Sequence, residues 1–248
     1  MNAINDINNN IDNNINRNRN KKTKFLLIHG FGGGVYEVKP LADLLITIGF
    51  EAVCPLLKGH SATRKEMQAA TCEGWIESAE KELLALKKTS DDAIILIGFS
   101  MGSLIAFNLA CMHEVKAIVI INAPIYYWNI SQMFLNIVED LRNKRSDYLK
   151  RYFVETGNFP LNSLIQFLKL LYKTKPLLQK ILCPVLMIQA EDDDTVKTKS
   201  VDYIYRHLSS EKKVIKLFSK GGHGILQSSA AEQVISCIEA YINEIAPL

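Results

Sequence analysis

The chain has 248 residues, of which 48% are hydrophobic and 22% charged, and its formal net charge is +3. These values are typical of a folded globular protein and exclude a wholly disordered chain, a collagen-like fibre and a coiled-coil rod. No apolar run reaches the roughly 20 residues of a membrane-spanning helix. The whole positive surplus lies in the first 24 residues, so the remaining chain is neutral, which argues against a nucleic-acid-binding domain.

The first 22 residues differ in composition from the remainder. Asparagine fills half of the first 20 positions, with isolated isoleucines between. Such a segment buries too little apolar surface to offset the entropy of ordering. We expect a disordered or weakly ordered Asn-rich tail over residues 1–22 and a single domain over residues 23–248.

The spacing of the cysteines and the sequence at the start of the chain indicate the cellular compartment of the protein. The five cysteines are scattered and show no C-x-x-C spacing, which favours buried thiols over zinc ligands or a disulfide framework. The start of the chain lacks the apolar stretch of a secretory signal. We therefore expect a cytoplasmic protein with no metal and no organic cofactor.

Six short apolar runs predict strands buried on both faces of a sheet. Amphipathic or apolar segments with helical spacing separate these runs. This alternation predicts an α/β domain with a mostly parallel sheet of about six strands flanked by helices. The strands are expected at 25–28, 52–54, 93–97, 117–121, 185–188 and 214–218, and the helices at 37–48, 75–88, 103–111, 198–208 and 231–245.

A long interval without strands follows the fourth predicted strand. Between Asn122 and Pro184 the sequence is helix-prone and rich in aromatic residues. Insertions of this length in a compact domain are usually functional, often as lids. We predict a helical cap at about 123–182, with a helical subdomain that only adds stability as the alternative.

A G-x-S-x-G motif spans residues 98–102, at the end of the third predicted strand. In this pattern a serine occupies a sharp turn between a strand and a helix, and small neighbours are needed because the turn crowds the backbone. An apolar strand precedes the motif and an apolar helix follows it. Ser100 is therefore the candidate nucleophile, against the alternative of a tight turn with an incidental serine.

A serine hydroxyl needs a general base, which follows the serine along the chain in this arrangement. Three histidines follow Ser100. His113 and His207 lie at the ends of predicted helices and are interpreted as helix C-terminal histidines. His223 lies in a glycine-rich loop after the last predicted strand, and we predict that it is the base.

A third residue should orient the imidazole and stabilise its cation. Four adjacent carboxylates, at 191–194, follow the fifth predicted strand directly. This is the correct edge of a parallel sheet for a site. Spacing alone does not choose among the four, and an acidic solvated turn fits those that are not used.

The glycine-rich segment 29–34 follows the first predicted strand and suits an oxyanion-binding loop. Such a loop can present a backbone N–H with no side chain in the way, and the second N–H donor should be that of Met101, after the nucleophile. Phosphate binding is the rival interpretation, but the segment lacks the ending of a P-loop. We interpret His29 as a structural hydrogen-bonding residue under the loop.

Taken together, these segments resemble the α/β-hydrolases, and more narrowly the small bacterial carboxylesterases related to monoacylglycerol lipases. The resemblance covers roughly residues 24–246. The segments that carry it are His29-Gly30-Phe31, residues 55–60, Trp75, the motif at 98–102, Asn122-Ala123-Pro124, Cys183-Pro184-Val185 and Gly222-His223.

The resemblance implies an α/β-hydrolase fold in which the insertion at 123–182 takes the place of the family's cap. It implies that the catalytic acid lies three residues after the small residue ending its strand, Ala190, which indicates Asp193. Asp192 and Asp194 remain the alternatives. It further implies oxyanion N–H groups on Phe31 and Met101.

The implied activity is that of a serine carboxylester hydrolase acting through an acyl-enzyme. The aromatic cap indicates an apolar acyl group, so the expected substrates are small-molecule short- to medium-chain acyl esters or monoacylglycerols. We expect no nucleic-acid partner and no integral membrane segment. The alternatives are a thioesterase or a proline-type aminopeptidase on the same triad, or a non-catalytic ligand-binding relative.

Overall fold

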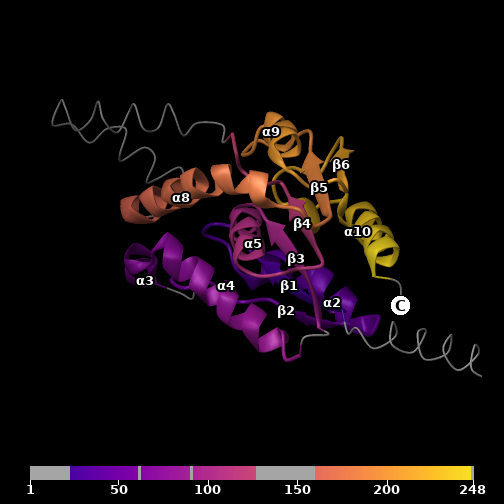
Figure 1. Ribbon diagram of the computed structural model, residues 1–248. Helices are drawn as coiled ribbons and strands as arrows, with labels where there is room; N and C mark the ends of the chain where they lie inside the picture. The colour runs from indigo at the N-terminus through magenta and orange to yellow at the C-terminus, as the bar shows by residue number, and fades with distance from the viewer. Residues whose placement is uncertain (1–22, 61–62, 90–91, 127–159, 247–248) are drawn as a thin grey trace, which may run out of the picture.

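A computed structural model describes residues 23–60, 63–89, 92–126 and 160–246. The tail predicted at 1–22 and most of the predicted cap lie outside these ranges. Six parallel strands form one sheet in the order β2-β1-β3-β4-β5-β6 (Figure 1). The strands are β1 (Thr23–Ile28), β2 (Glu51–Val53), β3 (Ala93–Phe99), β4 (Ala117–Ile121), β5 (Val185–Ala190) and β6 (Lys213–Phe218).

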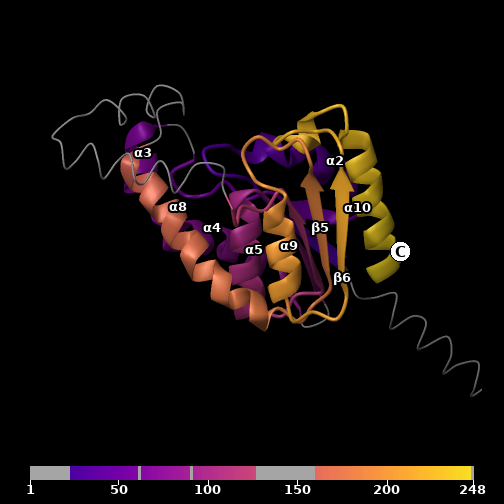
Figure 2. The ribbon, with the colours of Figure 1, turned by 90° about the horizontal axis from the view of Figure 1, so that it is seen from above.

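All six predicted strands are confirmed, with ends shifted by at most two residues. Helices cover both faces of the sheet, as the views from two directions show (Figures 1 and 2). The helices are α2 (Lys39–Thr47), α3 (Arg64–Ala69), α4 (Cys72–Leu86), α5 (Met101–Met112), α8 (Leu161–Thr174), α9 (Lys199–His207) and α10 (Ala231–Ile245), with 3-10 turns η1 (Val35–Glu37), η2 (Lys175–Lys180) and η3 (Ile225–Gln227).

Alternate strand residues feed two hydrophobic cores, which explains why the strand sequences are apolar without interruption. On β1, Leu26 and Ile28 point into the core beneath α4, α5, α8 and α9. Phe25 and Leu27 point into the core beneath α2 and α10. The sheet is thus the middle of three layers, and α5 is buried over most of its length because it packs against the centre of the sheet.

The described end of the predicted insertion joins this helical layer. Helix α8 runs beside α5 and reaches α3 (Figure 2). Asn108 on α5 donates a hydrogen bond of 2.8 Å to Thr174 at the end of α8. The segment 161–174 therefore packs on the body of the domain, and the limits of the cap remain a prediction.

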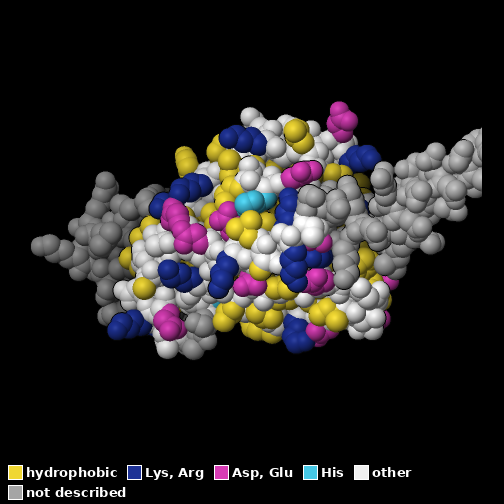
Figure 3. Space-filling view, turned by 60° about the horizontal axis from the view of Figure 1, so that its bottom comes forward, with side chains coloured by type: hydrophobic (Ala, Val, Ile, Leu, Met, Phe, Trp, Pro, Cys, Tyr) yellow, Lys and Arg dark blue, Asp and Glu magenta, His cyan; other side chains and the backbone are white. Residues whose placement is uncertain are grey.

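Helix length and surface charge complete the description. None of the helices in the described ranges is long and apolar enough to cross a membrane. On one face of the molecule, basic and acidic side chains are interspersed with hydrophobic ones (Figure 3).

Candidate active site

The residues singled out from the sequence gather at one edge of the sheet. All strands are parallel, so their carboxyl ends meet at this edge, where open α/β sheets place their sites. Phe31 follows β1, Ser100 follows β3, Asp193 follows β5 and His223 follows β6.

Ser100 occupies the predicted sharp turn between β3 and α5. Its dihedral angles are φ 50° and ψ −120°, in the region that side chains rarely adopt. Its N–H donates to the carbonyl of Ile121 at 2.8 Å, which ties the turn to the end of β4. A Cβ atom on Gly98 would lie 2.5 Å from the backbone nitrogen of Ser103, so the turn requires glycine there. Ser100 itself is 4% exposed.

A chain of hydrogen bonds joins Ser100, His223 and Asp193. The imidazole Nε2 of His223 lies 3.0 Å from Oγ of Ser100. Its Nδ1 lies 2.9 Å from Oδ2 of Asp193, whose side chain is fully buried. The other oxygen of Asp193 accepts N–H bonds from Thr195 and Val196, each of 2.8 Å. This arrangement can transfer a proton from the serine to the imidazole while the carboxylate stabilises the imidazolium.

The neighbouring carboxylates point elsewhere. Asp192 accepts hydrogen bonds from the backbone of Gly221 and Gly222. Asp194 is exposed and accepts a bond of 3.0 Å from the hydroxyl of Thr195. The choice that spacing left open therefore falls on Asp193 by geometry, and its catalytic role remains a prediction.

The two other histidines that follow Ser100 lie at helix ends, as predicted. His113 follows the last residue of α5, and its Nε2 lies 2.6 Å from a carboxylate oxygen of Glu80. His207 is the last residue of α9, and its Nδ1 lies 2.7 Å from the carbonyl of Tyr203. Neither contacts the serine.

His29 is the structural hydrogen-bonding residue that the sequence indicates. It is fully buried, and burial lowers its pKa, so the ring is neutral. Its Nδ1–H donates to the carbonyl of Gly30 at 2.9 Å, and its Nε2 accepts the N–H of Leu57 at 3.2 Å. The ring thereby joins the loop after β1 to the loop after β2.

The glycine-rich loop after β1 lies against the start of α5. A Cβ atom on Gly102 would lie 2.1 Å from the carbonyl oxygen of Ile28, so the helix approaches the end of β1 as closely as a backbone can. This approach brings the segment carrying Met101 beside the segment carrying Phe31. Their roles as oxyanion donors remain predictions.

The side chain of Glu37 hydrogen-bonds the backbone of this loop. Its carboxylate accepts the N–H of Gly30 at 2.9 Å and also hydrogen-bonds the backbone of Gly34. Burial raises the pKa of Glu37, and the nearby His223 acts in the opposite direction. A Cβ atom on Gly33 would lie 2.1 Å from the carboxylate, so the loop is shaped around this side chain.

Aromatic rings form a wall around Phe31. The ring centroid of Phe31 lies 5.3 Å from that of Phe167, 5.8 Å from that of Trp75 and 6.3 Å from that of His60. Burial lowers the pKa of His60 to about 4, so this ring is neutral as well. The wall is therefore apolar beside the predicted oxyanion loop.

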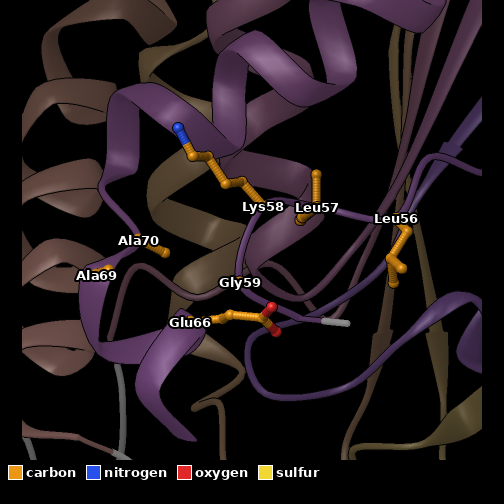
Figure 4. A pocket seen from close by; sticks show the side chains of 7 residues that line it. All are labelled: Leu56, Leu57, Lys58, Gly59, Glu66, Ala69 and Ala70. Atoms are coloured by element: carbon orange, nitrogen blue, oxygen red, sulfur yellow. The ribbon is translucent and has the colours of Figure 1, made fainter. Parts of the chain in front are cut away.

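A separate cavity of about 370 Å³ lies at the loop after β2 (Figure 4). Glu66 and Lys58 lie on its rim, with Lys58 extending away from Glu66. Neither Ser100 nor His223 lines it. Its lining consists of Leu56, Leu57, Lys58, Gly59, Glu66, Ala69 and Ala70.

Comparison with known proteins agrees with the fold. A family model described as the alpha/beta hydrolase fold matches residues 24–175. The chain belongs to the α/β-hydrolase fold family. A second model, described as serine aminopeptidase S33, matches residues 135–229 of this α/β hydrolase.

Two characterised relatives of this α/β hydrolase come from Bacillus. It is 31% identical to a thermostable monoacylglycerol lipase of Bacillus sp. strain H-257, over 77% of this chain and 79% of that protein. It is 25% identical to a carboxylesterase of Bacillus subtilis strain 168, over 81% of this chain and 84% of that protein.

Solved structures share the fold at lower identity. A lipolytic enzyme from a metagenome superposes with a TM-score of 0.76 at 19% identity, covering 90% of this chain and 94% of that chain. A monoglyceride lipase of Saccharomyces cerevisiae superposes with a TM-score of 0.71 at 20% identity, covering 91% of this chain and 87% of that chain.

Three further polar residues contact the site of this α/β hydrolase. Asn122 follows β4, Asp192 follows β5 and Glu37 lies in η1. Asn122 was noted only as part of the family resemblance, and Asp192 only as an alternative acid. Nothing in the local sequence of Glu37 marks it as a partner of the loop seven residues before it.

Proposed function

We propose that this protein is a serine carboxylester hydrolase that cleaves short- to medium-chain acyl esters or monoacylglycerols through an acyl-enzyme. The observation that carries the proposal is the position of His223, 3.0 Å from Oγ of Ser100 and 2.9 Å from a buried carboxylate oxygen of Asp193. The relatives named monoacylglycerol lipase and carboxylesterase support the ester as the reacting group.

In the first half of the proposed reaction, Oγ of Ser100 attacks the ester carbonyl and its proton passes to Nε2 of His223. Asp193 holds the Nδ1–H and stabilises the imidazolium. The N–H groups of Phe31 and Met101 bind the oxyanion of the tetrahedral intermediate. The intermediate collapses, the imidazolium gives its proton to the leaving alcohol, and the acyl group remains on Ser100.

In the second half, water replaces the alcohol. His223 takes a proton from the water, whose oxygen attacks the acyl carbon, and the same N–H groups bind the second oxyanion. Collapse releases the carboxylic acid and returns the proton to Oγ of Ser100. The cycle consumes one ester and one water and needs no further reactant.

The apolar wall supports a hydrocarbon acyl chain as the substrate group. Phe31 carries a predicted oxyanion donor and also packs against Phe167 and Trp75, so a carbonyl held at Phe31 lies next to aromatic surface. Burial of methylene groups on such a surface contributes about 0.8 kcal/mol each. Affinity should therefore rise with chain length until the wall is covered.

A cytoplasmic location is part of the proposal. All five cysteines of the chain are free thiols. Free thiols persist where glutathione and thioredoxin keep the compartment reducing.

The decisive test compares wild type with Ser100→Ala on p-nitrophenyl esters from acetyl to palmitoyl. We expect wild type to show a chain-length optimum, and the variant to lose at least about 1000-fold in kcat because the nucleophile is absent. Contaminating esterases are controlled by purifying both proteins identically, and the active fraction of wild type is measured by titrating Ser100 with a fluorophosphonate. Equal hydrolysis by the two proteins would refute the proposal.

A proline-type aminopeptidase is the second candidate, because the serine aminopeptidase model matches residues 135–229. The same triad would then attack an amide, and a thioesterase would use it on an acyl thioester. Prolyl anilides and acyl-CoA assayed beside the esters separate these activities. Failure of the fluorophosphonate to label Ser100, together with tight ligand binding, would instead indicate a non-catalytic ligand-binding relative.

A further inference from the structure

The segment that carries His223 packs against the domain over only part of its length: the centroid of the imidazole lies 5.2 Å from that of the Phe99 ring, and Gly221 faces the side chain of Ile225. The segment begins with Gly221 and Gly222, whose φ angles are +145° and +60°. A Cβ atom on Gly222 would meet nothing within 4 Å. A glycine in open space leaves the backbone many conformations, so groups that bind the backbone at Gly222 help to keep the imidazole in one position.

Asn122 holds the segment through its carbonyl groups. Its Nδ2 donates to the carbonyl of Gly222 at 3.1 Å and to that of His223 at 2.7 Å. Its Oδ1 accepts the N–H of Ala190 at 2.9 Å. The side chain is fully buried, and the three partners leave only one orientation of the amide. Asn122 has a φ of +49°, which asparagine tolerates better than most residues.

Asp192 holds the same segment through its N–H groups. Its Oδ1 accepts the N–H of Gly222 at 2.7 Å, and its Oδ2 accepts that of Gly221 at 3.2 Å. The hydrogen bonds from the N–H groups of Gly222 and Gly221 hold the pKa of Asp192 below its usual range, and the bond from Gly222 has the larger effect. A carboxylate that accepts hydrogen bonds from two backbone N–H groups makes charge-assisted and directional contacts.

We propose that Asn122 and Asp192 form a clamp that positions the imidazole of His223 between Ser100 and Asp193. Asn122 binds the carbonyl groups of the glycine segment, and Asp192 binds its N–H groups. Asn122 also binds Ala190, the last residue of β5, from which the chain continues to Asp193. The clamp thus joins the loop of the base to the loop of the acid.

The clamp rests on the proposed function, in which His223 is the general base. Proton transfer requires the imidazole within hydrogen-bond reach of both partners, and a displacement of about 1 Å can cost 100-fold in rate. Asn122 and Asp192 act through His223, and their side chains hydrogen-bond backbone groups of the glycine segment and Ala190 instead of Ser100, so they are positioning residues. Their loss should lower kcat and leave substrate affinity nearly unchanged.

The test uses Asn122→Gly and Asp192→Asn. Glycine adopts a φ of +49° freely, so the first variant removes the amide without adding backbone strain. The second keeps the size of the side chain and replaces one acceptor with an NH₂ group. Asp194→Asn is the matched control, since Asp194 is an adjacent, exposed carboxylate whose hydrogen-bond partner is the hydroxyl of Thr195.

Three readouts are measured on each full-length protein. They are kcat and KM for p-nitrophenyl butyrate per fluorophosphonate-titrated site, the melting temperature, and the downfield proton NMR signal of the hydrogen bond between His223 and Asp193. We expect kcat to fall about 10- to 100-fold in Asn122→Gly and about 10-fold in Asp192→Asn, with KM within about 2-fold. The downfield signal should broaden in both variants and stay sharp in the control.

A purely structural role would lower the melting temperature and leave kcat per titrated site and the downfield signal unchanged, and that result would overturn the clamp. If Asn122→Gly fails to fold, the result for Asp192→Asn decides whether the clamp exists, because the side chain of Asp192 is exposed. Wild type without Ser100-dependent hydrolysis would refute the proposed function instead. In that case the downfield signal alone decides whether the clamp exists.

Discussion

Glu37 places a half-buried carboxylate against the loop that carries the predicted oxyanion donor Phe31. The carboxylate binds the backbone of Gly30 and Gly34, on the two sides of Phe31, Gly32 and Gly33. Glycine-rich loops are costly to order, so this contact should hold the N–H of Phe31 toward the site. Glu37 would then act on the oxyanion without touching it.

Glu37→Gln should therefore lower kcat about 10- to 100-fold, because oxyanion donors act in the transition state and their misalignment lowers kcat more than it raises KM. The NH₂ group of glutamine faces a backbone N–H and cannot accept its hydrogen bond. Steady-state kinetics on p-nitrophenyl butyrate measure the effect.

Asp43→Asn is the control for this change. Asp43 is an exposed carboxylate on α2 that pairs with Lys39 at 2.6 Å, and its substitution should leave kcat unchanged. Unaltered kcat in Glu37→Gln, in protein that melts as wild type does, would exclude a role for the carboxylate in the loop.

At the scale of single residues, the sequence predicted the serine and the histidine more sharply than the acid. The motif and the glycine-rich loop each contain a single candidate, whereas four carboxylates follow β5 in a row. Which of them faces the imidazole depends on how the turn after β5 folds. Here two backbone N–H bonds turn Asp193 inward, and Asp192 faces the glycines. Local spacing does not contain that information.

The contact between α5 and β1 is a feature of whole elements, since it sets the distance between the nucleophile turn and the oxyanion loop. Gly102→Ala should destabilise the fold by at least about 1–3 kcal/mol, because the added methyl group would lie 2.1 Å from a backbone carbonyl that cannot move without shifting β1. Urea unfolding followed by circular dichroism measures this free energy.

Gly34→Ala provides the comparison for this steric argument. Its φ is −166°, which any residue adopts, and its added methyl group would lie 3.4 Å from the ring of Tyr36. Its unfolding free energy should change by less than about 0.5 kcal/mol. Equal stability of the two variants would mean that α5 can move away from β1 at little cost.

Sequence patterns predicted the strands and long helices that fill the two cores and missed helix α3, which adds a single side chain to one of them. The strands and long helices carry apolar periodicity because they pack on the sheet. Helix α3 buries only Met67, so it gives no such signal. Its capping pattern was nevertheless readable: Thr63 accepts the N–H of Glu66 at 3.2 Å, as the spacing of a capping box allows.

At the scale of the whole molecule, burial governs the chemistry of the cysteines. Burial raises the pKa of all five thiols, and those of Cys54 and Cys183 rise to about 11. At pH 8 a thiol with a pKa of about 11 is roughly 200-fold less ionised than free cysteine with a pKa of about 8.5. The thiolate is the reactive form, so both thiols should be inert in the native protein.

Ellman's reagent tests this at pH 8. We expect slow labelling of Cys54 and Cys183 in native protein, and labelling more than about 100-fold faster in guanidinium chloride. Cys54→Ser and Cys183→Ser identify the two signals. Fast native labelling of either residue would show that the strand edge or loop beside it opens readily.

The separation of Ser100 and His223 by 123 positions has a consequence during synthesis of the protein. A nascent chain that has released only β1 to β5 from the ribosome still lacks His223, the proposed base. Until β6 pairs with β5 and its following loop is placed, the serine remains an ordinary alcohol. On the proposed mechanism, the emerging chain is inert toward acyl esters, and hydrolysis begins only when the domain is assembled.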